Sequence, residues 1–192
     1  MLTIDRKLNL VVPIDRGDSK FYIHAMPITL QTYEKYWLVL SKTFSAFAEN
    51  GIVITSAPSV AKFTLKQVAQ ETSRDTGGNW WDGDDGVGGK SGLIEEIVRL
   101  CNVIDGDNIR PLKDLMTSGA VDEETQGDIL SLLIFFTVAS RIPPRKNRER
   151  IIRGMALIYG LQVEYSTATE FANFLKTSIS ADSTGEKDDK TS

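Results

Sequence analysis

The chain has 192 residues, of which 41% are hydrophobic and 25% are charged, and these values fit one globular domain with a sizeable core. Its net charge of −4 argues against general electrostatic attraction to nucleic acid. The single cysteine, Cys101, excludes an internal disulfide, and its apolar neighbours predict a buried, inert thiol. The N-terminus lacks the apolar segment of a secretion signal, so we expect a protein of a reducing cytoplasm.

The first 27 residues predict a β-hairpin. Residues 3–12 alternate between apolar and polar side chains, and residues 19–26 alternate less regularly. A segment rich in Pro, Asp and Gly separates them and is typical of a turn. A hairpin alone is only marginally stable, so we expect it to pack against helices or against another chain.

Two helices are predicted next. The first runs from about Thr29, which can cap it, to Glu49, and Asn50-Gly51 ends it. The second begins near Pro58 and fades near Arg74. Spacings of three and four residues predict which side chains face inward. In the first helix they are Leu30, Tyr33, Trp37, Leu40, Phe44 and Phe47. The second helix carries the apolar residues Val60, Phe63, Leu65 and Val68.

Residues 75–92 are rich in glycine and show no apolar periodicity, so they predict a loop. Two adjacent tryptophans, Trp80 and Trp81, lie within it. Large aromatic side chains are costly to leave in water. They are therefore expected either to pack on the core or to contact a partner.

The same segment contains incomplete ligand-binding motifs. Residues 86–91 resemble the end of a phosphate-binding loop, but Asp84 stands where that motif needs glycine. A calcium loop beginning at Asp82 would need oxygen ligands where Gly86 and Leu93 stand. A loose, weak cation site is the alternative, but we expect neither a metal site nor a cofactor.

The middle of the chain predicts a buried central helix. A helix from Ser91 to about Val103 and a shorter one from Pro111 to Gly119 precede it. The central helix spans residues 122–141, with acids at its start and Arg141 at its end, which complements a helix dipole. Residues 129–139 are apolar on nearly every face, so we expect other helices to surround them. The run is too short to cross a bilayer.

The last part of the chain predicts two more helices and a tail. One helix spans residues 145–160, and another follows a capping box at residues 167–170. Residues 178–192 have little to bury and are predicted to be disordered. The sequence thus predicts a mainly α protein of the α+β type with a single domain, residues 1–177. Its hairpin, residues 1–27, precedes about six to seven helices in residues 28–177.

No constellation of residues predicts an enzyme. The only histidine, His24, lies in a predicted strand, and no His or Cys pair has metal-ligand spacing. A basic stretch at residues 141–153 favours a solvated helix face, an acidic protein partner or nucleic acid, and the last is least consistent with the acidic chain. The candidate partner-binding residues are Trp80, Trp81, Arg145, Lys146 and Arg148.

The order of several segments resembles the tail assembly chaperones of long-tailed, siphovirus-type bacteriophages. These segments are the opening LTIDRKLNLVVPI and FYIHAMPI, the aromatic TYEKYWLVLSKTF, the apolar LLIFFTVAS and the closing MALIYGLQVEYSTATEFANFL. The resemblance covers most of the chain that is predicted to be ordered, but it carries no catalytic motif. The glycine-rich segment 75–92 departs from it.

The resemblance implies a non-enzymatic protein of the host cytoplasm that binds the tape-measure protein, keeps it soluble and is absent from the mature virion. It also implies that a longer, frameshifted form recruits the tail-tube protein. Self-association through the hairpin edge is compatible with this reading, whereas nucleic acid and membranes are not expected partners. Two alternatives are open: a structural virion protein, such as a tail-completion or connector subunit, and a small regulatory nucleic-acid-binding protein.

Overall fold

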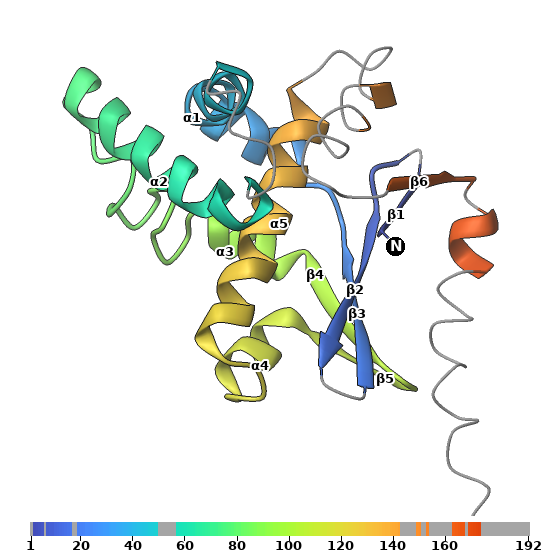
Figure 1. The fold of residues 1–192 in the computed structure, drawn as a ribbon. Coiled ribbons are helices and arrows are strands. Elements are labelled where there is room, and N and C mark those ends of the chain that lie inside the picture. Colours follow the sequence, from blue (N-terminus) through green and yellow to red (C-terminus); the bar gives the residue numbers. More distant parts are fainter. Residues whose placement is uncertain are drawn as a thin grey trace, which may run out of the picture.

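The computed structural model describes residues 2–5, 7–16, 19–49, 57–142, 149, 150, 153, 163–167 and 169–173. Groups of strands are separated along the chain by groups of helices (Figure 1). In chain order the elements are β1 (Leu2–Asp5), β2 (Leu10–Arg16), β3 (Ser19–Ala25), α1 (Leu30–Glu49), α2 (Ala57–Thr76), α3 (Leu93–Arg99), β4 (Cys101–Asp105), β5 (Asn108–Pro111), α4 (Leu112–Thr117), α5 (Glu123–Arg141) and β6 (Val163–Ser166).

The strands form one sheet in the order β5-β4-β3-β2-β1-β6. Strands β1 to β5 pair antiparallel with their neighbours, and β6 pairs parallel with β1. Helices α1 to α5 lie on one side of this sheet (Figure 1). The predicted architecture, a hairpin followed by a helical bundle, is therefore wrong. The protein is a two-layer α+β structure in which the sheet is a substantial part.

The first correction lies in residues 3–12, which form two strands rather than one. The carboxylate of Asp5 accepts hydrogen bonds from the backbone N–H groups of Lys7 and Asn9, both at 2.8 Å. It also accepts one from Nδ2 of Asn9 at 2.9 Å. Leu8 completes the turn with a φ of +71°. Asp5 is buried, and these bonds hold a tight reversal that alternation of side chains does not reveal.

The second correction lies in residues 91–103, predicted as one helix. Helix α3 ends at Arg99, and residues 101–105 form β4. Ser91 does not cap α3, whose cap position is Gly92. The register places Val103 opposite Ile23 and Ile104 opposite Tyr22 of β3. β-Branched side chains pack well on a pleated sheet, so pairing with a distant strand overrides helical continuation.

The long helices agree with their predictions. The hydroxyl of Thr29 accepts a hydrogen bond from the N–H of Thr32 at the start of α1. Asp122 caps α5 by accepting one from the N–H of Thr125 at 2.7 Å. This bond lowers the pKa of Asp122. Gly119, predicted to end α4, has a φ of +70°, a conformation that glycine adopts easily.

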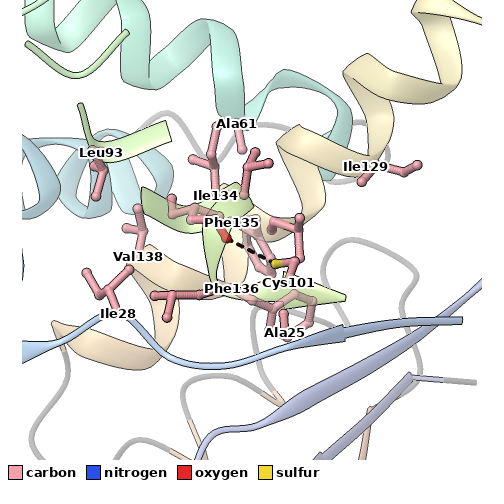
Figure 2. Packing of buried hydrophobic residues seen from close by; sticks show 14 of the residues in the cluster. Ala25, Ile28, Ala61, Leu93, Cys101, Ile129, Ile134, Phe135, Phe136 and Val138 are labelled. Atoms are coloured by element: carbon pink, nitrogen blue, oxygen red, sulfur yellow. Dashed lines mark hydrogen bonds between the residues drawn. The ribbon is translucent and has the colours of Figure 1, made fainter. Parts of the chain in front are cut away.

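Helix α5 forms the middle of the core, as predicted. The ring of Phe135 lies 5.8 Å from that of Phe47 in α1, and α5 also packs along α2. The next residue, Phe136, lies beside Cys101 and Ala25 of the sheet (Figure 2). Consecutive side chains of α5 thus contact opposite layers, which explains why its apolar residues are not confined to one stripe.

A short helical segment, residues 169–173, lies on the other side of the sheet (Figure 1). The predicted capping box at its start is confirmed, because Thr167 and Glu170 exchange backbone-to-side-chain hydrogen bonds at 2.7 and 3.3 Å. Phe171 is buried there and lies 6.0 Å from His24 of β3. This segment therefore packs against β3 on the face of the sheet opposite to helices α1 to α5.

Two predictions fall largely outside the described residues. Of the helix predicted at 145–160, residues 149, 150 and 153 are described, and all three are helical. The tail, residues 178–192, lies wholly outside. Within the described ranges, no helix combines the length and the apolar character needed to cross a membrane.

Candidate partner-binding surfaces

The glycine-rich segment is a compact loop that packs on α1 and α2. The N–H of Val87 donates to the carbonyl of Trp80 at 2.7 Å, and the N–H of Ser91 donates to the carbonyl of Asp84 at 2.9 Å. Val87 is fully buried. The hydroxyl of Tyr36 in α1 donates to the carbonyl of Asp85 at 2.6 Å. The loop is thus held by its own backbone and by the neighbouring helix.

Close backbone approach explains the glycines of this loop. A Cβ atom on Gly89 would lie 2.0 Å from the carbonyl oxygen of Gly83, and one on Gly92 would lie 1.9 Å from that of Gly86. Real side chains do not tolerate such distances. These glycines therefore allow two backbone segments to pass close together. This packing is a structural reason for the glycine-rich composition that also resembled a phosphate-binding loop.

Trp80 and Trp81 both pack against the core and remain half-buried. The indole Nε1 of Trp80 donates to the hydroxyl of Thr76 at 2.9 Å, and its backbone N–H donates to Oγ of Ser73 at 2.8 Å. The ammonium of Lys66 lies 5.5 Å from the ring centroid of Trp81. Of the two readings left open by the sequence, packing on the core is observed, and each ring keeps a partly accessible surface.

The acids of the loop do not gather around a ligand site. Asp85 forms an ion pair with Lys35 at 2.9 Å, and Asp75, just before the loop, forms one with Lys42 at 3.1 Å. Among the residues that the structure describes, no group of three or more His, Cys, Asp or Glu side chains could hold a metal ion. A hollow of about 420 Å³ lies between the loop and α1, and Trp80 and Asp84 line it.

The basic stretch is only partly described. Arg145, Lys146 and Arg148, the predicted partner-binding bases, lie outside the described residues. Arg141, the first base of the stretch, donates from Nη2 to the carbonyl of Ile28 and so joins the end of α5 to the segment before α1. Arg153 pairs with Glu149 at 3.1 Å, one helical turn earlier.

Two aromatic side chains are exposed that the sequence did not single out as exposed. Trp37 of α1, predicted to face inward, is 51% exposed, and Phe63, an apolar residue of α2, is 69% exposed. In α2 the buried positions Ala61, Leu65 and Ala69 repeat at four-residue spacing. Phe63 lies on the opposite side of the helix from them. Comparing the complete apolar pattern of α2, including its alanines, with a helical repeat would have revealed this.

The apolar face of α1 is wider than the surface that covers it. Tyr36, Val39 and Leu40 are buried against the core. The stripe that includes Leu30 and Trp37 lies beside this face, and Leu30 is 65% exposed. Of the predicted seam, Tyr33 is half-buried against the core and Leu40 is buried, whereas Leu30 and Trp37 are exposed and form an uncovered apolar strip.

The buried thiol of Cys101 and the half-buried imidazole of His24 lie apart. Burial raises the pKa of the Cys101 thiol to about 12, and its Sγ donates to the carbonyl of Ile97 at 3.1 Å. Burial also lowers the pKa of His24, and the nearby charge of Asp5 partly opposes this shift. Cys101 pairs with Ala25, so its side chain lies on the face opposite to that of His24. This arrangement does not provide a thiolate next to a base.

Comparison of the chain with protein-family models, with curated proteins and with solved structures finds no significant match.

Proposed function

We propose that this protein is a tail assembly chaperone of a long-tailed bacteriophage, which binds the tape-measure protein and keeps it soluble while the tail tube assembles around it. The proposal begins from the segmental resemblance described above. The observation that supports it most directly is the uncovered apolar strip of α1, Leu30 and Trp37. A large aromatic side chain left half in water is typical of an anchor for a protein partner.

The client expected for such a strip is a segment with an apolar stripe of its own. A long amphipathic helix aggregates when its stripe is exposed, and a helix laid against α1 would cover both stripes. A tape-measure protein is long, so many chaperone copies would bind along it. Each contact can then be weak while the assembly remains soluble.

The proposal includes the cellular context that the resemblance implies. The chaperone acts in the host cytoplasm and is left out of the mature virion. A longer frameshifted form brings the tail-tube protein to the coated client. Recovery of this chain from purified particles in stoichiometric amounts would instead indicate a structural virion subunit.

Co-expression with the tape-measure protein encoded in the same genome tests the proposal. We expect the client to be soluble with this chain and to aggregate without it. Trp37→Ser should reduce the soluble fraction of the client, because it removes the exposed aromatic anchor of the strip. Ile109→Ser is the matched control, since Ile109 of β5 is also more than half exposed but lies on the sheet. A client that is equally soluble alone would contradict the proposal.

A further inference from the structure

A second surface, on α2, combines an exposed aromatic ring with lysines that lack a carboxylate partner. Phe63 stands out from this helix, and Lys62 and Lys66 flank it one helical turn apart. Trp81 of the glycine-rich loop adds its ring beside Lys66. We call these four residues the α2 patch.

The lysines of the α2 patch differ from those of α1. Lys35 and Lys42 each form an ion pair with an aspartate of the loop region, at 2.9 and 3.1 Å. Within the described part of the chain, neither Lys62 nor Lys66 forms an ion pair with a carboxylate. The ammonium of Lys66 lies instead over the π face of Trp81. Two positive charges therefore remain available beside an exposed phenyl ring.

The glycine-rich loop holds Trp81 in place beside Lys66. The backbone carbonyl of Trp81 accepts a hydrogen bond from the N–H of Gly88 at 3.1 Å. The ring lies so close to Gly88 that a Cβ atom there would be 3.0 Å from Trp81 Cζ2. The indole is therefore fixed between the loop backbone and Lys66, and a partner would meet a surface that needs little ordering.

We propose that the α2 patch binds an acidic amphipathic helix, with Phe63 against its apolar stripe and Lys62 and Lys66 against carboxylates that flank the stripe. The lysines lie at positions i and i+4 of one helix, and carboxylates one turn apart on a partner helix have matching spacing. Charge complementarity thus selects the partner's chemistry, and the aromatic rings supply the apolar contact. The identity of the helix as part of the tape-measure protein rests on the proposed function. The preference of the α2 patch for an acidic amphipathic helix is independent of that function.

A pair of synthetic helical peptides tests the patch directly. Both carry the same leucine stripe, and it is flanked by glutamates in one and by lysines in the other. We expect the full-length protein to bind the glutamate peptide about tenfold more tightly, and this preference should shrink at high salt. Equal affinity for the two peptides, or binding of neither, would overturn the proposal.

Variants assign the binding to the patch. Lys66→Glu should weaken binding of the glutamate peptide about tenfold and favour the lysine peptide, and Phe63→Ser should weaken both. Lys7→Glu, the same charge change at an exposed position in the β1–β2 turn, is the control. A thermal unfolding curve establishes that each variant is folded. An equal loss of affinity in Lys7→Glu would show that net charge, not the patch, governs binding.

The same experiments can also reveal two other binding partners for the α2 patch, namely nucleic acid and a second copy of this chain. A single-stranded oligonucleotide that binds through Lys66 while the glutamate peptide does not would overturn the proposal in favour of nucleic acid. A dimer of this chain that Lys66→Glu dissociates would overturn it in favour of self-association. If the peptide binds as expected but the tape-measure protein is soluble alone, the proposed function fails and the inference about the α2 patch stands.

Discussion

The ring of Phe171 lies 6.0 Å from the imidazole of His24, with the two ring planes at 53°. This contact joins the short C-terminal helical segment to β3, a central strand of the sheet. His24, the only histidine of the chain, is half-buried, and burial lowers its pKa below 6.5. Because the pKa of His24 differs between the folded and unfolded chain, the stability of the protein should depend on pH.

The first prediction follows from this pKa. Below pH 6.5 the unfolded chain binds a proton at His24 more readily than the folded chain does, so stability falls as the pH drops through 6.5 toward the folded pKa. Above pH 6.5 the contribution is fully present. His24→Gln should have a flatter stability profile in this window, measured by urea unfolding at several pH values. Identical profiles for the variant and the wild type would contradict it.

Removal of the covering ring gives a second test of the same contact. Phe171→Ala should expose the imidazole and move the pKa of His24 back toward 6.5, because less desolvation opposes its charge. Since His24 is the only histidine, its NMR signal can be titrated without assignment of others. An unchanged titration would show that Phe171 does not bury it.

The third prediction concerns the core around α5. Phe136→Ala should lower the free energy of unfolding by about 3–5 kcal/mol, because the side chain is buried between α5 and the sheet. Leu133→Ala should cost about 2–5 kcal/mol for the same reason. The matched control is Phe63→Ala, the same change on an exposed surface, which should cost about 0.5 kcal/mol or less. Equal losses at Phe136 and Phe63 would contradict the packing.

The fourth prediction compares two glycines. Gly92→Ala should destabilise the protein by about 1–3 kcal/mol, because its Cβ would meet the carbonyl oxygen of Gly86 and the backbone would have to move. Gly127→Ala in α5 meets no atom within 4 Å and should stabilise by about 0.5–1 kcal/mol, since alanine favours a helix. Thermal or urea unfolding of both variants measures the difference. Effects of the same sign would be inconsistent with a tightly packed loop.

The fifth prediction concerns the turn between β1 and β2. Asp5→Ala should cost about 1–3 kcal/mol, because it leaves the N–H groups of Lys7 and Asn9 without their acceptor. Asp5→Asn keeps one acceptor oxygen and should fall between the alanine variant and the wild type. Urea unfolding of the three proteins tests this order.

The elements that could be predicted from the sequence are those with a local cause. Helices α1 and α2 are long enough for apolar periodicity to indicate them, and α5 is indicated by its long apolar run between an acidic start and a basic end. Their ends carry residues such as Thr29 and Asp122 that bond to the first turn. The capping box at Thr167 belongs to the same class. Each depends on side chains within a few positions, so no knowledge of the fold is needed.

The candidate binding surfaces could be predicted less well. The sequence pointed to Trp80 and Trp81 as costly to expose, and the structure packs both against the core. It placed Trp37 inside, and Trp37 is exposed. Whether that residue is covered depends on the neighbouring elements, which helical periodicity does not encode. The exposure of Phe63, by contrast, follows from the four-residue repeat of Ala61, Leu65 and Ala69 on the other side of α2.

The sequence by itself determined the long helices, through their apolar pattern and their caps. It also determined that any chemistry that needs a histidine would have to use His24. Only the tertiary structure decided that residues 101–105 form a strand, because Val103 and Ile104 suit a buried helix or a strand until β3 supplies a partner. It also decided the compact path of the glycine-rich loop, where Gly89 and Gly92 pass backbone that is near only in the folded chain. Where a segment strongly prefers helix or strand, that local preference decides its structure. Where the two preferences are similar, pairing with a distant strand decides it.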